Sequence, residues 1–465
     1  MVKLSNLKFC YSSGMVIFMT ELLTPEQMYR ADQLCGLDEV LLIENAGRAV
    51  AEEIIRRYGA RKTVVLCGPG NNGKDGEVVA RYLKSWGWPV EVSDDVSGAE
   101  LIIDALYGAG LNRDFPQVLA EKINGAGVPI VSIDVPSGLD GNSGQPHRAC
   151  VKADLTVTFF RKKPAHVLQP GRALCGEVVV LDIGIPDSVL SDIQPAYCEN
   201  RKPGIPLLAM AGHKFDRGHA VVVSGGKLNT GASRLTAQAA LQIGAGLVTL
   251  AGKAEALTVH ACHLTAVMLA EIETPRALAD LLADERKNAV CIGPAAGIAE
   301  ATRQMVQAIL AGSAHVVLDA DAITSCQSNP RELFDWIQKK QLGQVVLTPH
   351  DGEFLRLFGS LDGTKIARAI FAAKLSGAII VLKGSDTVIA HPDGRATVNT
   401  NAPPSLATAG SGDVLAGILT GLLAQNMEAY AAACAAVWLH GQIGQNLAGT
   451  HFTADDLVKQ IAAQL

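Results

Sequence analysis

The sequence is poor in aromatic residues and has no long apolar segment. Phe, Trp and Tyr make up 5% of the 465 residues, whereas hydrophobic residues make up 48%, so Ala, Val, Leu and Ile must fill the cores. This balance is typical of Ala- and Gly-rich α/β enzymes. No apolar run approaches the ~20 residues that a membrane-spanning helix requires. Because a domain holds roughly 100–200 residues, the length predicts more than one domain.

The sequence also lacks a basic excess and any paired-cysteine motif. The formal net charge is −6, whereas a general nucleic-acid binder is usually basic. The ten cysteines form no CxxC pair, and Cys262-His263 has no second ligand pair at metal spacing. We therefore expect reduced core thiols in a cytoplasmic protein. The first 18 residues favour a loose extension, or a start at Met19, over a signal peptide, because no clear cleavage site follows them.

The first half of the chain alternates strand and helix patterns. Buried strands are expected over 63–67, 89–92, 100–106, 128–135, 153–160 and 176–184, and a helix over 75–87. Such alternation predicts an α/β domain with a Rossmann-like parallel sheet covered on both faces. Pro, Gly and charge gather over 198–218, which divides the chain into domains 19–205 and 206–465.

The second half repeats the alternation. Strands are expected over 219–226, 316–322, 344–350 and 378–386, and helices over 230–246, 412–425 and 429–447. Open α/β sheets bind ligands at the carboxyl ends of their strands. In both halves polar residues stand at those ends, namely Asn71, Asp104, Asp134, Asp319, His350 and Lys383. The pattern predicts two separate sites, one in each half.

A glycine-rich loop follows the first of these strands. CGPGNNGKDG (67–76) contains Gly68-x-Gly70-x-x-Gly73 between a strand and a helix, which is the context of a dinucleotide-binding fingerprint. Backbone N–H groups beside a helix N-terminus suit phosphate, and Asp75 is expected to cap the helix. Pro69 and the polar continuation of the loop disagree with a site for a redox coenzyme.

Three motifs of the first half resemble the NAD(P)H-hydrate epimerase family. They are GPGNNGKDG (68–76), IDALYGAGLNR (103–113) and DVPSGLDGNSG (134–144), with Lys74 where the family usually has glycine. The resemblance spans residues 24 to about 190. It implies that the hydrated dinucleotide is bound by Asn71, Asn72, Gly73, Lys74, Asp75, Gly108, Ala109, Gly110, Leu111, Asn112, Arg113, Asp114 and Asp134.

The same resemblance implies a potassium ion held by Asn72, Asp104 and Ser137, whose oxygen atoms suit a hard cation. Water added across the reduced nicotinamide ring leaves a hydroxyl on C6, next to the ring nitrogen. General acid–base catalysis can release this hydroxyl and return it on either face of the ring. Asp104 is the candidate acid, although a bound cation would favour its ionised form.

A second glycine-rich loop, ATAGSGDVLAG (407–417), opens a helix in the second half. Its backbone N–H groups can stabilise a transferring phosphoryl group, and Asp413 can accept a proton from an attacking hydroxyl. No GxxxxGK[ST] motif is present, so the loop is not a P-loop. The alternative is that Asp413 is only a first-turn acid stabilised by the helix dipole.

Six motifs in order resemble the ADP-dependent NAD(P)H-hydrate dehydratase family, which has a ribokinase-like α/β fold. They are GHKFDRGHAVVVSGG (212–226), TGASRLTAQAALQIGAGLVTL (230–250), LDADAI (318–323), TPHDGEF (348–354), VLKGSDTVI (381–389) and LATAGSGDVLAGI (406–418). The resemblance implies that Lys383, Gly384, Ser385, Asp386, Thr387 and Gly412 bind the adenine nucleotide. It implies that Ala232, Gly297, His350 and Asp413 contact the hydrated substrate.

In the implied reaction Asp413 is the base for phosphorylation of the C6 hydroxyl, with Mg²⁺ bridging the phosphates. Phosphate then leaves, and loss of the C5 proton restores the ring. Ala295, in place of a glycine, and Pro403-Pro404 depart from the family pattern near this site. Both families tend to self-associate, so a homo-oligomer is expected.

The resulting hypothesis is a bifunctional repair enzyme. The first half interconverts the R and S epimers of hydrated NADH and NADPH. The second half dehydrates the S epimer at the expense of ADP, giving AMP and phosphate. We expect no nucleic-acid or membrane partner. Two alternatives are a vitamin-precursor kinase with a nucleotide-sensing domain, and a first domain that has become a non-catalytic interaction module.

Overall fold

A computed structural model describes residues 17–205 and 213–464. The chain divides into two compact units after Cys198, and residues 17–20 group with the second unit. The division falls within strand β8 (Tyr197–Pro203), which belongs to the second unit's sheet and which the sequence analysis did not predict. The proposed boundary between 205 and 206 therefore lies beyond this strand. Residues 1–16 of the proposed extension lie outside the described residues.

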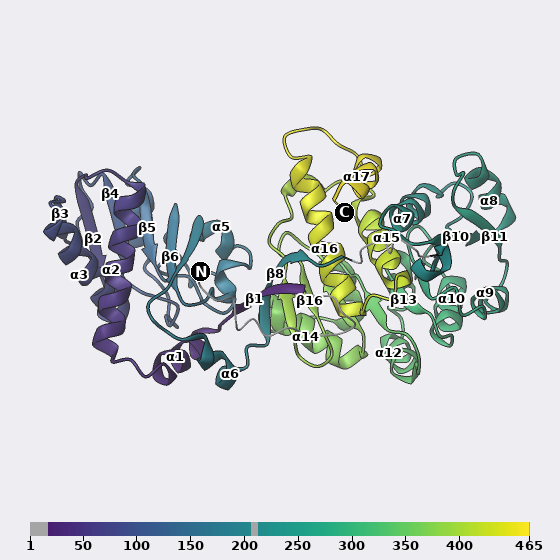
Figure 1. Ribbon diagram of the computed structural model, residues 1–465, viewed down its shortest axis with the longest axis horizontal. Coiled ribbons are helices and arrows are strands. Elements are labelled where there is room, and N and C mark those ends of the chain that lie inside the picture. The colour runs from purple at the N-terminus through teal and green to yellow at the C-terminus, as the bar shows by residue number, and fades with distance from the viewer. Residues whose placement is uncertain (1–16, 206–212, 465) are drawn as a thin grey trace. The chain divides into compact units, whose positions relative to one another are not determined.

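The first unit is built on a six-stranded sheet in the order β3-β2-β4-β5-β6-β7, and every adjacent pair is parallel (Figure 1). The strands are β2 (Thr63–Cys67), β3 (Val90–Val92), β4 (Leu101–Ala105), β5 (Ile130–Ile133), β6 (Leu155–Phe159) and β7 (Glu177–Leu181). Strands β4, β5 and β6 are fully buried, as their continuous apolar runs predict for a sheet covered on both faces. The helices of this unit are α1 (Pro25–Leu34), α2 (Glu39–Arg57), α3 (Asn71–Ser85), α4 (Gln117–Asn124), α5 (Gly171–Cys175) and α6 (Leu190–Ile193).

Helix α3 corrects the expected start of the first glycine-loop helix. It begins at Asn71 with Gly70 as its N-cap, so Asp75 lies inside the helix rather than at its cap. Close packing explains the glycine at 76, because a Cβ there would lie 2.5 Å from the Ala105 Cβ of β4. The polar sequence of the loop thus does not prevent tight contact between helix and sheet.

The second unit contains an eleven-stranded sheet in the order β1-β8-β17-β16-β15-β14-β13-β12-β9-β10-β11. The strands from β11 to β15 are parallel, whereas β15, β16 and β17 pair antiparallel. The strands are β1 (Ile17–Leu22), β9 (His219–Val223), β10 (Leu247–Gly252), β11 (Met268–Glu271), β12 (Ala289–Ile292), β13 (His315–Leu318), β14 (Val345–Leu347), β15 (Ile379–Leu382), β16 (Val388–Ala390) and β17 (Ala396–Val398).

Eleven α-helices of this unit accompany the sheet in the described part of the chain: α7 (Gly231–Gln242), α8 (Ala254–Ala261), α9 (Pro275–Leu282), α10 (Glu300–Leu310), α11 (Ala320–Ser325), α12 (Pro330–Lys339), α13 (Asp351–Phe358), α14 (Lys365–Ser376), α15 (Ser411–Ala424), α16 (Ala429–Asn446) and α17 (Ala454–Gln460). Both units are thus α/β, as the strand–helix alternation predicts.

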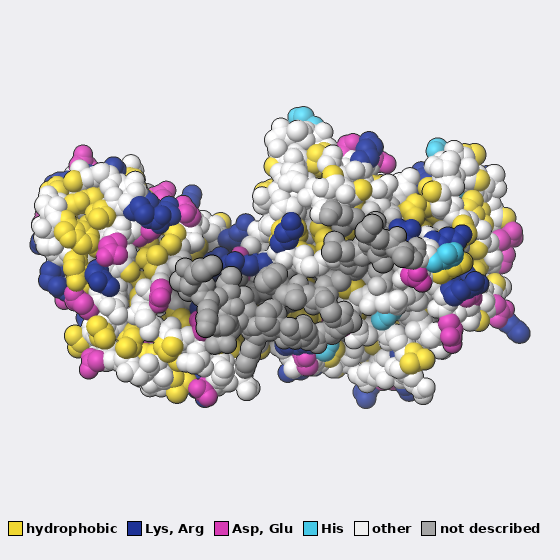
Figure 2. Space-filling view, in the orientation of Figure 1, with side chains coloured by type: hydrophobic (Ala, Val, Ile, Leu, Met, Phe, Trp, Pro, Cys, Tyr) yellow, Lys and Arg dark blue, Asp and Glu magenta, His cyan; other side chains and the backbone are white. Residues whose placement is uncertain are grey.

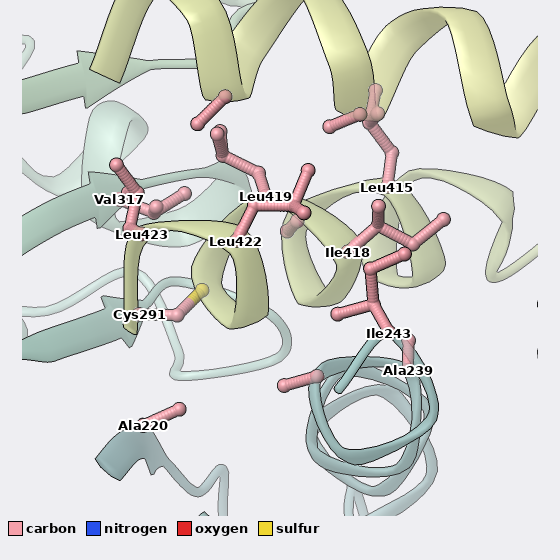
Figure 3. Close-up of a cluster of buried hydrophobic side chains, with 14 of the residues drawn as sticks. Ala220, Ala239, Ile243, Cys291, Val317, Leu415, Ile418, Leu419, Leu422 and Leu423 are labelled. Carbon is pink, nitrogen blue, oxygen red and sulfur yellow. The ribbon is translucent and has the colours of Figure 1, made fainter. Parts of the chain in front are cut away.

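Helix α15 is the centre of the larger core. Its Leu and Ile side chains lie between α7 and the β12 and β13 residues Cys291 and Val317 (Figure 3). Helices α7 and α15 approach so closely that a Cβ at Gly417 would lie 2.3 Å from the Thr236 carbonyl oxygen. Gly417 lies one turn beyond Asp413, so this contact is close to the part of α15 that belongs to the second glycine loop.

Candidate active sites

The first unit holds a cavity of about 720 Å³ at the carboxyl ends of its strands. On the face seen in Figure 2, acidic and basic side chains are intermixed. The residues predicted from the sequence that line it are Asn71, Asn72, Asp75, Gly108, Ala109, Gly110, Leu111, Asn112, Arg113 and Asp134. The fold therefore brings three separate motifs to one place.

Three predicted residues do not line this cavity. Gly73 is required by the turn itself, because a Cβ there would lie 1.8 Å from the Gly68 carbonyl oxygen. Lys74 is half-exposed and donates from Nζ to Asn71 Oδ1 over 3.0 Å. Asp114 is exposed. Lys74 thus holds the side chain of a lining residue, and it does not crowd the glycine loop.

Asp134 stands at the end of β5 in a strained backbone conformation, with φ of 67°. Its Oδ2 accepts from the Ala109 N–H at 2.8 Å, and its Oδ1 lies 2.6 Å from Lys163 Nζ. Burial alone would raise the pKa of this carboxyl, but the Lys163 ammonium and these hydrogen bonds outweigh burial and lower the pKa. Asp134 is therefore a carboxylate facing the cavity.

Lys163 is a site residue that the sequence analysis did not identify. Its side chain is 2% exposed, lines the cavity and also donates to Thr158 Oγ1 at 2.7 Å. His166 Nδ1 accepts from the Lys163 N–H, so its Nε2 donates to the Asp134 carbonyl oxygen at 2.9 Å. Lys163 lies outside the three family motifs of this unit, so no local pattern marked it.

Asp104 lies outside the cavity and is fully buried. Its carboxylate accepts from the Ser132 hydroxyl at 2.8 Å, from the Ser137 N–H at 2.9 Å and from the Ser137 hydroxyl at 2.5 Å. Burial outweighs these bonds and raises its pKa. The placement gives Asp104 a role in holding the loop after β5 and does not support direct proton transfer to a ligand in the cavity.

The side chain of Asn72 is a candidate ligand for a cation. Its Nδ2 is buried and has no hydrogen-bond partner among the described residues. The two ends of an amide are assigned by their surroundings, and an oxygen in that position would instead be a ligand for a hard cation. The carboxylate of Asp104 and the hydroxyl of Ser137, already in contact with each other, are donors of the same kind.

Two more carboxyls face the same cavity. Asp32 comes from α1 and Asp75 from α3, and no hydrogen bond or ion pair to either carboxyl occurs in the described part of the chain. Asp75 is 8% exposed. Burial raises the pKa of Asp32 to about 6, against the opposing effect of Lys163, and raises that of Asp75 well above its usual value. Asp32 has no motif spacing that could have identified it.

In the second unit, Lys383 organises the carboxylates that follow the central strands. Its Nζ lies 2.7 Å from Asp319 Oδ1 and 3.9 Å from Glu353 Oε2. Burial alone would lower the pKa of Lys383, but the two carboxylates outweigh burial and raise it. Lys383 is therefore a fixed cation at the carboxyl end of β15.

The start of α15 lies beside this cation, since a Cβ at Gly412 would be 3.7 Å from Lys383 Nζ. Burial and the neighbouring Asp319 raise the pKa of Asp413 to about 6, and Lys383 opposes the shift. The Thr236 hydroxyl donates to the carbonyl oxygens of Ala232 and Asp413, both at 3.0 Å. The structure thus brings Ala232, Gly412, Asp413 and Lys383 together.

The predicted nucleotide loop, 383–387, is closed by its own contacts. Thr387 Oγ1 donates to the Gly384 carbonyl oxygen at 2.8 Å and accepts from the Gly384 N–H at 3.1 Å. Asp386 is 6% exposed and its Oδ1 accepts from Lys365 Nζ at 2.6 Å. Ser385 is exposed. Lys365, at the start of α14, is a further contact that the motifs did not indicate.

The two remaining predicted substrate residues flank this region. His350 caps α13 through Nδ1, which accepts from the Gly352 N–H at 2.9 Å, and its side chain is half-exposed. Gly297 has φ of 86° and donates its N–H to Asp321 Oδ2 at 2.8 Å. Ala295, which replaces a family glycine, has φ of 53°. The substitution thus leaves an alanine in a conformation that favours glycine.

Family models match both units. A model described as NAD(P)H-hydrate dehydratase matches residues 220–464, and one described as YjeF-related protein N-terminus matches 39–96 and 90–165. None of the helices in the described ranges is long and apolar enough to cross a membrane.

Relatives match along most of the chain. A bifunctional NAD(P)H-hydrate repair enzyme of Moorella thermoacetica is 33% identical, with 92% of each chain covered. One of Archaeoglobus fulgidus is 35% identical over 95% of this chain and 98% of its own. A crystal structure of the ADP/ATP-dependent NAD(P)H-hydrate dehydratase of Bacillus subtilis, co-crystallised with ATP and Mg²⁺, is 28% identical, with a TM-score of 0.50 over 56% of this chain and 93% of its own. The chain belongs to the family of bifunctional NAD(P)H-hydrate repair enzymes.

Proposed function

We propose that the chain repairs hydrated NADH and NADPH in two steps, epimerisation in the first unit and ADP-dependent dehydration in the second. The observation that carries the proposal is that two sets of family motifs gather at two separate sites, one around Asp134 and Lys163 and the other around Lys383 and Asp413. The vitamin-precursor kinase is not favoured, because the relatives that span both units are named repair enzymes.

In the first unit, release of the C6 hydroxyl leaves a positively charged iminium ring. The Asp134 carboxylate stabilises this cation electrostatically and accepts a proton from the water that returns. Lys163 holds the carboxylate in place, while the His166 bond to the backbone fixes the strained residue itself. The first proton must come from another group that keeps it near neutral pH.

A potassium ion in this unit would be held by oxygen atoms of Asn72, Asp104 and Ser137. It would supply positive charge that offsets the buried Asp104 carboxylate and attracts a dinucleotide phosphate. The unpartnered amide of Asn72 supports this assignment.

In the second unit, Asp413 removes the proton of the C6 hydroxyl, whose oxygen attacks the terminal phosphorus of ADP. The P–O–P bond breaks and AMP leaves. The C6–O bond then breaks, phosphate departs with the electron pair, and the C5 proton is lost. Backbone N–H groups at the start of α15 face the transferred phosphoryl group, and Lys383 stabilises its charge.

Mg²⁺ would neutralise phosphate charge in this step. Mg²⁺ takes only one or two carboxylate ligands from a protein when it binds nucleotides. Asp319 and Glu353, which both contact Lys383, would be these ligands. The Bacillus subtilis relative was crystallised with ATP and Mg²⁺, so we propose that ADP or ATP occupies the loop at 383–387. Location in the cytoplasm and self-association stay predictions from the sequence.

The test uses the full chain and a mixture of both epimers of hydrated NADH. With ADP and Mg²⁺, absorbance of the reduced nicotinamide should recover completely. Asp134→Asn should limit rapid recovery to the S epimer, and Asp413→Asn should prevent rapid recovery of either. Full recovery by Asp134→Asn, at the rate of the unaltered chain, would refute the epimerase assignment.

A further inference from the structure

The cavity of the first unit is lined by two carboxyl groups that form no hydrogen bond or ion pair within the described residues. Asp134 is paired with Lys163, but neither the Asp32 carboxyl nor the Asp75 carboxyl has a partner among the described residues. Asp75 is more than nine-tenths buried and lines the cavity. An unpaired buried carboxyl destabilises a fold. Its position in a ligand cavity therefore indicates that it interacts with the bound ligand.

The two carboxyls can also supply the acid that epimerisation needs in addition to Asp134. Epimerisation needs an acid to protonate the departing hydroxyl and a base to deprotonate the returning water. Asp134, held as a carboxylate by Lys163, can only accept a proton. Asp32 comes from α1, a different element, and reaches the same cavity.

We propose that Asp32 is a catalytic residue of this cavity, the acid that protonates the C6 hydroxyl of the hydrated nicotinamide ring. The inference rests on the epimerase activity proposed above. The Asp32 proton moves to the C6 oxygen, the C6–O bond breaks, and water leaves with the electron pair. The lone pair of the ring nitrogen forms the C=N bond. Water then adds to the other face of C6 and loses a proton to the Asp134 carboxylate. Asp134 releases this proton to solvent, and solvent returns a proton to Asp32.

Burial favours the protonated form of Asp32 and raises its pKa to about 6, and the neighbouring Asp134 carboxylate adds to that shift. Lys163 acts in the opposite direction but is already shared with Asp134 and Thr158. The titratable and charged groups around the cavity, which any pH profile must consider, are Tyr29, Asp32, Glu39, Asp75, Tyr107, Arg113, Asp134 and Lys163.

The experiment uses the full chain without ADP, so that epimerisation proceeds without dehydration. A single epimer of hydrated NADH is the substrate, and chromatography follows the other epimer. We expect Asp32→Asn to lower kcat about 100-fold, as loss of a general acid does, with KM changed less than about 3-fold. Asp32→Glu should recover to within about 10-fold. Asp192→Asn, which removes an exposed carboxylate of the same unit, is the matched control and should change neither constant.

Thermal unfolding distinguishes a catalytic role from a structural one. Removal of an unpaired carboxyl should raise the Tm of the first unit by about 2 °C in Asp32→Asn, whereas loss of a structural residue would lower it. Retention of kcat within about 3-fold, a change in KM alone, or a lower Tm would overturn the inference while leaving the epimerase assignment intact. Absence of epimerisation by the unaltered chain would refute the proposed function itself, and the inference with it.

Discussion

The Asp134–Lys163 pair allows a prediction about which half of an ion pair is costlier to remove. Lys163 is 2% exposed and Asp134 is 19% exposed, through the cavity. Asp134→Asn leaves an ammonium that is almost completely buried, and Asn tolerates the φ of 67° that this position requires. Lys163→Met leaves a carboxylate that water can reach and that still accepts from the Ala109 N–H.

The two variants should therefore differ in stability. Breaking a buried pair costs about 3–5 kcal/mol when the remaining charge is enclosed, which we expect for Asp134→Asn. A partly hydrated remaining group costs about 1–3 kcal/mol, which we expect for Lys163→Met. Because the pair is lost only once, the double variant should cost less than the sum of the two single variants.

Hydrogen exchange is the appropriate assay, because a chain with two units need not unfold in one step. Peptides covering β6 (Leu155–Phe159) report on the strand that carries Thr158, the other partner of Lys163. Lys74→Met, which removes one member of an exposed ion pair near the same cavity, is the control and should change protection by under about 1 kcal/mol. Equal costs for the two single variants, or a larger cost for Lys163→Met, would refute the argument from burial.

Three further predictions concern single positions. Dehydration at saturating ADP should fall off as the pH drops through about 6, because Asp413 takes up a proton there and can no longer act as a base; a kcat/KM profile that stays flat down to pH 5 would contradict this. Ala295→Gly should stabilise the second unit by about 0.5–1 kcal/mol in urea unfolding, because it relieves the φ of 53° at some cost in chain entropy. Gly73→Ala should destabilise the first unit by at least about 1–3 kcal/mol, since its Cβ would overlap the Gly68 carbonyl oxygen; unchanged exchange protection of α3 would show that the loop can adjust.

The strands of the first unit's sheet were predictable from local patterns, and most of the lining of its cavity was predictable from the resemblance of three motifs to a family. β-branched runs gave the central strands, and glycine-rich motifs at strand ends marked Asn72, Asp134 and Asp413. The start of α3 was misplaced because Gly and Asn have low helix propensity, which is here overridden by contact with the sheet.

Other features depend on contacts between distant residues and left no local signal. Asp32 sits in an ordinary amphipathic helix, and Lys163 follows β6 in a loop without a glycine fingerprint. The hairpin of β16 and β17 consists of three-residue strands, which are too short for periodicity to show. Strand β8 lies largely in the Pro- and charge-rich stretch that was interpreted as a domain boundary.

The close approach of α7 and α15 affects how the second site can evolve. A hydroxyl and a glycine, rather than bulky side chains, set the distance between the backbones that carry Ala232 and Asp413. Aliphatic residues elsewhere in the core can be exchanged for one another with little effect on that distance. Lineages that alter the catalytic rate through this core should therefore keep the residues at 236 and 417 small, and should vary the loops above them instead.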